Sequence, residues 1–89
     1  MKIESLKIKD VIVFRPEPLS DKRGIFMENY LKKDFESIAG MSFEILQENI
    51  SISSKGVLRG LHYQVEPYEQ GKILQVLDGE IYDVAVDLR

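Results

Sequence analysis

The chain has the sequence pattern of short β-strands, most clearly in the segments where hydrophobic and polar residues alternate so that one face can be buried. A run of β-branched and aromatic residues predicts a strand over residues 11–14, and strand-like patterns predict others over residues 25–30, 43–53, 57–63, 72–77 and 80–88. Pro16 and Pro18 close the first of these strands, because proline cannot donate a backbone hydrogen bond to a neighbouring strand. Asp78-Gly79 separates the last two strands and is a strong signal for a tight hairpin turn.

One segment, residues 32–39, has helical rather than strand periodicity. Leu31, Phe35 and Ile38 recur at helical spacing, and Gly40 stands where a left-handed residue ends many helices. Many short strands with a single short helix predict an all-β fold of the sandwich or barrel kind. The chain has no internal repeat and no linker, so we expect residues 1–89 to form a single domain.

Two of the predicted strands carry information beyond the fold class. In the strand over residues 43–53, one face carries Gln47, Asn49 and Ser51, a polar row that a protein core rarely contains. This face is therefore expected to meet water or a ligand. In the strand over residues 80–88, one face is wholly apolar, and the sequence stops at Arg89 without a turn. Such a strand needs a partner or more chain, so we expect the domain to be incomplete.

Composition narrows the classes of function. The 89 residues include 12 Lys and Arg, 15 Asp and Glu, one histidine and no cysteine. The absence of cysteine excludes disulfides, zinc ribbons and thiol catalysis, and a single histidine excludes any site that needs two. A net charge of −3 argues against a general nucleic-acid or membrane-surface binder. The N-terminus is charged where a signal peptide is apolar, so we expect a cytoplasmic protein.

The single histidine, His62, lies in the segment GVLRGLHYQ over residues 56–64. A neutral imidazole is a common proton acceptor near pH 7, although a histidine hydrogen-bonded within a sheet would look the same. Arg59 and Lys72 are further polar groups within strand-like segments, and Gly60 would permit close approach of a ligand. In a regular strand Arg59 and His62 face opposite sides, so a shared pocket requires a bend near Gly60.

The same region partly matches a metal-binding motif of cupin folds. Gly56, His62 and Glu69 have the motif's spacing, but Gln64 occupies the position of the second histidine. Glutamine is a poor ligand for transition metals, which favour imidazole or thiolate. The pattern therefore predicts a jelly-roll pocket without a metal, and no cofactor.

A second cluster surrounds the turn at Arg23. The arginine is suited to bidentate contact with phosphate, and Phe26 nearby could stack on a base, with Glu28 two residues further on. An ordinary charged turn before an edge strand would have the same residues. The role of Lys72 also has more than one interpretation. Its side chain could polarise an oxyanion, bind phosphate or simply be solvated.

Five segments together resemble the dTDP-4-dehydrorhamnose 3,5-epimerase family, in the family's order and at its approximate spacing. They are RGIFMENY (23–30), QENIS (47–51), GVLRGLHYQ (56–64), QGK (70–72) and YDVAVDLR (82–89). The resemblance implies a cupin-like double-stranded β-helix, or jelly roll, that needs no metal. It also implies a homodimer that exchanges N-terminal strands and acts on dTDP-4-dehydro-6-deoxyglucose, on the route to dTDP-L-rhamnose.

The resemblance assigns roles to residues by position. His62 resembles the general base that removes the protons beside the C4 ketone, and Lys72 resembles the cation that stabilises the enolate. Residues that resemble the lining of the sugar and diphosphate site are Gln47, Asn49 and Arg59. Residues that resemble nucleotide contacts, some of them reaching across the dimer, are Arg23, Phe26 and Glu28.

Family members are about twice this length, and the proton-donor tyrosine and the carboxylate partner of the histidine lie in their later half. We therefore expect this chain alone to turn over more slowly by orders of magnitude. Two other functions stay open. One is a truncated, inactive epimerase-like protein that binds dTDP-sugars, and the other is a different cupin-type sugar-nucleotide isomerase, such as a 3-epimerase or a ketoisomerase.

Overall fold

The computed structural model covers residues 1–89 and divides them into two units, Met1–Glu48 and Asn49–Arg89. Its regular elements are four short strands and one short helix, in agreement with the expected all-β class. The strands form two separate two-stranded sheets, and both sheets lie in the first unit. The two units are described separately below.

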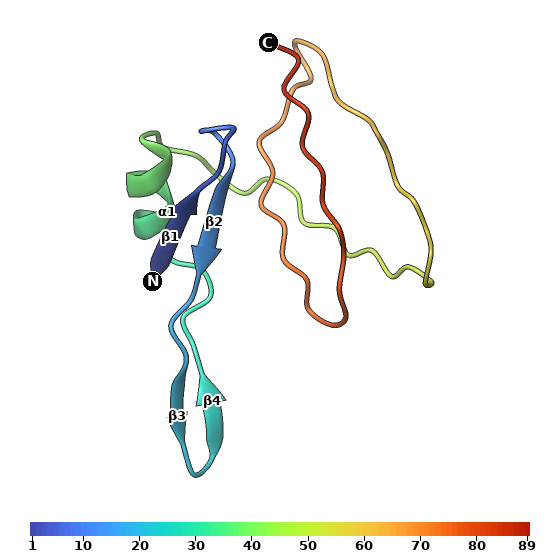
Figure 1. The fold of residues 1–89 in the computed structure, drawn as a ribbon. Helices are drawn as coiled ribbons and strands as arrows, with labels where there is room; N and C mark the ends of the chain where they lie inside the picture. The colour runs from blue at the N-terminus through green and yellow to red at the C-terminus, as the bar shows by residue number, and fades with distance from the viewer. The chain divides into compact units, whose positions relative to one another are not determined.

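The first sheet pairs β1 (Lys2–Ser5) with β2 (Ile12–Arg15) in antiparallel register (Figure 1). Ile3 lies opposite Phe14, so these two side chains share one face of the sheet. Strand β2 fulfils the prediction made for residues 11–14, whereas β1 was not predicted. The four residues of β1 are all exposed, and its sequence, KIES, has too few apolar residues to predict a strand.

Helix α1 (Lys32–Ala39) has the predicted bounds, and it supplies the core of the first unit. Phe35 is the one buried apolar side chain, with 5% of its surface exposed. Its ring stacks on Phe14 of β2 at a centroid distance of 4.0 Å, and Tyr30 approaches it edge-on at 4.7 Å. Aromatic contacts of this kind add to the free energy gained by burying the ring. The core is therefore one phenylalanine held between the helix and the first sheet.

The end of α1 is set by Gly40, as the sequence predicted. Its backbone is left-handed, with φ of 68° and ψ of 19°, a conformation that costs little only for glycine. The N–H of Gly40 donates to the carbonyl of Glu36 at 2.9 Å and so satisfies one of the carbonyls that a helix end leaves unpaired.

The second sheet is a hairpin of β3 (Leu19–Asp21) and β4 (Gly24–Phe26). Its turn consists of Lys22 and Arg23, at the turn that the sequence predicted around Arg23. The strand predicted over residues 25–30 is therefore shorter than expected, because it stops pairing at Phe26 where β3 begins. Every residue of both strands is exposed.

The second unit contains no strand or helix. The strands predicted over residues 57–63, 72–77 and 80–88 are therefore not formed as hydrogen-bonded strands, and neither is the strand predicted over residues 43–53, which spans the boundary between the units. The chain bends at residues 77–79, near the predicted turn, and runs as extended arms on either side (Figure 1, orange to red). Alternation specifies which face a side chain takes, but a strand also needs a paired neighbour, which here is lacking. Nowhere does the structure have a helix long and apolar enough to cross a membrane.

Candidate functional site

The eight candidate site residues divide equally between the two units. The first unit carries Arg23, Phe26, Glu28 and Gln47, and the second carries Asn49, Arg59, His62 and Lys72. All eight side chains belong to exposed residues. We therefore describe the contacts that each group makes within its own unit.

Arg23, in the turn of the β3–β4 hairpin, is bound to Asp21. Its backbone N–H donates to Asp21 Oδ1 at 2.8 Å, and its Nη2 donates to Asp21 Oδ2 at 2.6 Å. The hydrogen bonds from the Arg23 side chain lower the pKa of Asp21, and the same carboxylate raises the pKa of Arg23. The charge of Arg23 is thus compensated within its own turn.

The other two candidates near this hairpin have few neighbours. Phe26 pairs with Leu19 across the hairpin, and 72% of its surface is exposed. Glu28 follows the end of β4 in an irregular segment. The exposed ring of Phe26 is available for stacking, and its contact with a base stays a prediction.

Arg59 is held by a serine on the other side of a tight turn. Its Nε donates to the Oγ of Ser53 at 2.9 Å. The turn between them is closed by the Val57 N–H, which donates to the Ser54 carbonyl at 3.3 Å. Gly56 takes the third position of this turn with φ of 83°, the positive value that a type II turn requires there. From the sequence, Ser53 was placed only at the end of the strand predicted over residues 43–53. The available signal was its position before a tight turn, six residues from an arginine.

The backbone between Arg59 and His62 departs from a regular strand. Gly60 has φ of 123°, a value outside the range of a regular strand, in which Arg59 and His62 would face opposite sides. A Cβ atom added to Gly60 would lie 3.7 Å from His62 Nδ1, which places this glycine directly beside the imidazole. The assignment of His62 as a base stays a prediction.

The remaining candidates lie in extended backbone. Gln47 and Asn49 fall on either side of the boundary between the units, and Lys72 lies in the segment that leads to the bend at residues 77–79. No group of three His, Asp or Glu side chains in this structure lies close enough to hold a metal ion.

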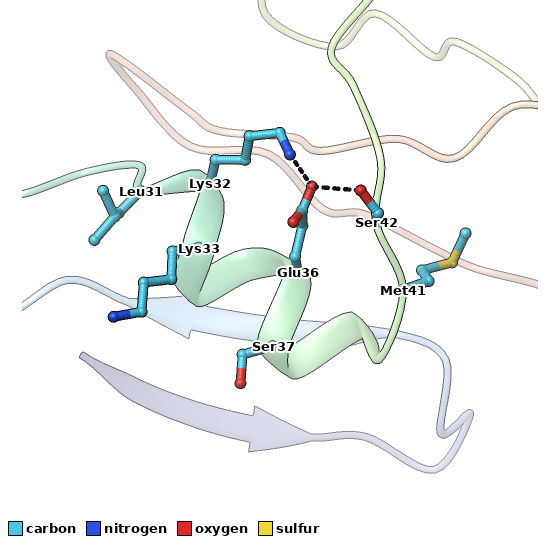
Figure 2. A pocket seen from close by; sticks show the side chains of 7 residues that line it. All are labelled: Leu31, Lys32, Lys33, Glu36, Ser37, Met41 and Ser42. Carbon is cyan, nitrogen blue, oxygen red and sulfur yellow. Dashed lines mark hydrogen bonds and ion pairs between the residues drawn. The ribbon is translucent and has the colours of Figure 1, made fainter.

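A shallow, open hollow lies elsewhere, beside α1, and is lined by Leu31, Lys32, Lys33, Glu36, Ser37, Met41 and Ser42 (Figure 2). Glu36 Oε1 accepts hydrogen bonds from Lys32 Nζ, from Ser42 Oγ at 3.2 Å and from the Phe43 N–H at 3.1 Å. These donors, Lys32 foremost, lower the pKa of Glu36, and Glu36 in turn raises the pKa of Lys32. The carboxylate is engaged in fastening residues 42 and 43 to the helix, and none of the eight candidates lines this hollow.

The fold and these polar groups define a small, mostly β protein whose candidate binding groups lie on turns and extended segments. The chain belongs to the dTDP-4-dehydrorhamnose 3,5-epimerase family, because the sequence profile of that family matches residues 5–89. The resemblance drawn from the sequence motifs is thereby confirmed.

Curated relatives support the same family. The chain is 51% identical over 89 residues to the dTDP-4-dehydrorhamnose 3,5-epimerase of Shigella flexneri, covering all of this chain and 49% of the relative. It is 48% identical to the protein of the same name in Pseudomonas aeruginosa, again over 100% and 49%. The Escherichia coli K12 protein is 42% identical, over 100% of this chain and 48% of its own length. The chain thus spans about half the length of these relatives. No solved structure matches it.

Proposed function

We propose that the protein acts in an epimerase that inverts C3 and C5 of dTDP-4-dehydro-6-deoxyglucose, in the biosynthesis of dTDP-L-rhamnose. The observation that carries this proposal is the identity of 51% over the whole chain with a relative named for the activity. The aligned length includes the segment GVLRGLHYQ, with the only histidine of the chain.

The chemistry begins with removal of a proton next to the C4 ketone. His62 takes the proton from C3, the electron pair moves into the carbonyl, and the C4 oxygen becomes an enolate. Lys72 supplies a cation that stabilises this developing negative charge. A proton returned to the opposite face of C3 inverts the centre, and the same sequence at C5 completes the reaction. No residue of this chain is assigned as the donor of the returned proton.

Binding of the nucleotide sugar involves the other candidates. Arg59, Gln47 and Asn49 contact the sugar and the diphosphate, and Arg23, Phe26 and Glu28 contact the nucleotide. Exposure of the Phe26 ring and of the Arg59 guanidinium supports these roles. We further propose that the whole protein is a cytoplasmic homodimer with exchanged N-terminal strands. In this proposal residues 1–89 form part of one jelly-roll domain, and the reaction uses no cofactor.

The test is solvent exchange at the two carbons. The protein is incubated with dTDP-4-dehydro-6-deoxyglucose in D₂O, and deuterium at C3 and C5 is followed by NMR. His62→Asn should lower the exchange rate by at least 100-fold, within the range attributed to a general base. Tyr63→Phe, a change at the neighbouring exposed residue, should leave the rate unchanged.

Three outcomes separate the candidate functions. Exchange that persists in His62→Asn would exclude His62 as the base. Binding of dTDP without any exchange would favour a nucleotide-sugar binding protein. Exchange at C3 alone would favour a 3-epimerase.

A further inference from the structure

The four arginines of the chain differ in the charge of the group that holds them. Three are paired with carboxylates: Arg15 with Glu4 at 3.0 Å, Arg23 with Asp21 at 2.6 Å, and Arg89 with Asp87 at 3.1 Å. Arg59 is held instead by the neutral hydroxyl of Ser53, at 2.9 Å. A hydroxyl accepts the hydrogen bond without neutralising the guanidinium, so Arg59 keeps its positive charge for another partner.

Which nitrogen of Arg59 makes the contact matters as much as the charge of the group that accepts it. Ser53 engages only Nε of Arg59. The two terminal nitrogens, which present the parallel N–H groups that bind phosphate oxygens in pairs, are left for a ligand. Fixing one nitrogen of a planar guanidinium also restricts its rotation, which reduces the entropy that binding would otherwise cost.

We propose that Ser53 is a positioning residue that orients Arg59 for the diphosphate of the nucleotide sugar without cancelling its charge. This inference rests on the proposed function, because it concerns the same binding site. It assigns a role to a residue that does not itself contact the substrate.

The local backbone is built to hold this pair in place. The turn closed by the Val57 N–H and the Ser54 carbonyl reverses the chain, so that Ser53 and Arg59 meet although they are six residues apart. Gly60, immediately after the arginine, lies beside the imidazole of His62. The residue directly after the positioned arginine thus adjoins the candidate base, which fits an arginine that holds the substrate near the reacting carbon.

Four variants test the proposal by dTDP binding, measured by isothermal titration calorimetry on the whole protein. Ser53→Ala removes the acceptor and should weaken binding about tenfold, the effect of losing one hydrogen bond to a charged group. Ser53→Thr keeps the hydroxyl and should restore binding to within twofold of the wild-type protein. Ser54→Ala, which changes the next serine of the same turn, is the matched control and should also stay within twofold.

Ser53→Asp is the decisive variant, because it separates holding the arginine from preserving its charge. The carboxylate should hold Nε at least as firmly as serine does, as Asp21 holds Arg23. We nevertheless expect dTDP binding to weaken tenfold or more, because the guanidinium is then already paired with an anion. If Ser53 only stabilised the turn, this variant would bind dTDP as tightly as the wild-type protein, and that result would overturn the proposal.

Exchange of the Arg59 Nε proton with water, followed in ¹⁵N NMR spectra, gives a second readout that does not depend on the ligand. The proton should exchange slowly in the wild-type protein, Ser53→Thr and Ser53→Asp, and several-fold faster in Ser53→Ala. Equal exchange rates in the wild-type protein and Ser53→Ala would show that Ser53 does not hold Arg59, and would overturn the proposal.

Failure of the inference and failure of the proposed function remain distinguishable. If the wild-type protein binds dTDP and Ser53→Ala and Ser53→Asp bind equally well, only the inference fails. The wild-type protein could also fail to bind dTDP but bind inorganic pyrophosphate, with the variants ranked in the same order of affinity. In that case the nucleotide-sugar function fails, and the proposal that Ser53 positions Arg59 for an anion stands. If the wild-type protein binds neither dTDP nor pyrophosphate, both the inference about Ser53 and the proposed function are overturned.

Discussion

The first unit, Met1–Glu48, has a helix, two sheets and a buried aromatic ring, whereas the second unit, Asn49–Arg89, has only extended chain and turns. The candidate base and its cation, His62 and Lys72, lie in the second unit, where every residue is exposed. The regular structure of this chain and its candidate catalytic chemistry therefore come from different parts of the sequence. The same division is common in enzymes, where reactive groups lie on irregular segments.

The arginines show the same contrast at the level of single residues. In the hairpin of the first unit, Arg23 is neutralised by Asp21, two residues away. In the second unit, Arg59 is held by a hydroxyl and keeps its charge. The two arginines thus differ in the charge of the acceptor beside them, a carboxylate for Arg23 and a neutral hydroxyl for Arg59.

Among the substitutions that test this difference between the units, truncation of the buried side chain of the first unit is expected to have the largest effect on stability. Phe35→Ala should lower the free energy of unfolding by about 3–5 kcal/mol, the range for truncating a buried phenylalanine. It should also remove the stacking with Phe14 and the edge contact with Tyr30. Urea denaturation followed by the amide NMR signals of α1 measures the change.

The matched control for Phe35 is an aromatic residue of the second unit. Tyr82 is 94% exposed, and Tyr82→Ala should change the free energy of unfolding by no more than about 0.5 kcal/mol. Similar losses from the two substitutions would contradict the view that only the first unit has a core.

A smaller effect is expected from two glycines that differ in backbone conformation. Gly40→Ala forces a Cβ into the left-handed conformation that ends α1, at a cost of about 1 kcal/mol. Gly71→Ala should cost less than about 0.5 kcal/mol, because its φ is not positive and its added Cβ meets no atom within 4 Å. Thermal unfolding followed by circular dichroism compares them, and equal stability of the two variants would show that Gly40 does not set the helix end.

The smallest expected effect is a dependence of stability on acid pH. The hydrogen bonds from Lys32, Phe43 and Ser42 hold the pKa of Glu36 below its ordinary value of 4.5. A carboxylate with a lowered pKa stabilises the folded chain above about pH 4.5, and this contribution is lost as the pH falls through the lowered value. Carboxyl NMR titration should place the Glu36 midpoint below 4.5, and Glu36→Gln should reduce the loss of stability in acid.

Asp87 in the second unit provides the comparison for Glu36. Its pKa is lowered from 3.8 by hydrogen bonds from one neighbour, Arg89, whereas Glu36 receives three donors from a helix and the segment after it. Asp87→Asn should therefore change the acid stability of the chain less than Glu36→Gln does. The reverse order would show that the hydrogen bonds of Glu36 do not fasten the helix to residues 42 and 43.

The helix could be predicted in full because its signals are local. The spacing of Leu31, Phe35 and Ile38 defines its apolar face, and Gly40 defines its end. Strand β2 was predictable from its β-branched residues, whereas β1 was not, because it depends on pairing with β2 across the intervening turn. The long segments after residue 43 show the limit of alternation, since a pattern of faces does not supply the neighbour with which a strand must bond.

The candidate site could be predicted from the sequence as a set of residue types within family motifs, but its contacts could not. Arg59 was identified from its position in GVLRGLHYQ, whereas its link to Ser53 depends on the turn at Gly56. A bend near Gly60 was inferred only as a condition for a shared pocket, and what the structure shows at this glycine is a positive φ.

The edge-on contact of Tyr30 with Phe35 has an optical consequence. The chain has four tyrosines and no tryptophan, so tyrosine provides all of its intrinsic fluorescence. Tyr30 is 37% exposed, whereas Tyr63, Tyr68 and Tyr82 are between 71% and 94% exposed. Acrylamide should therefore quench Tyr30 least, and the emission that resists quenching reports on the aromatic core of the first unit without any added label.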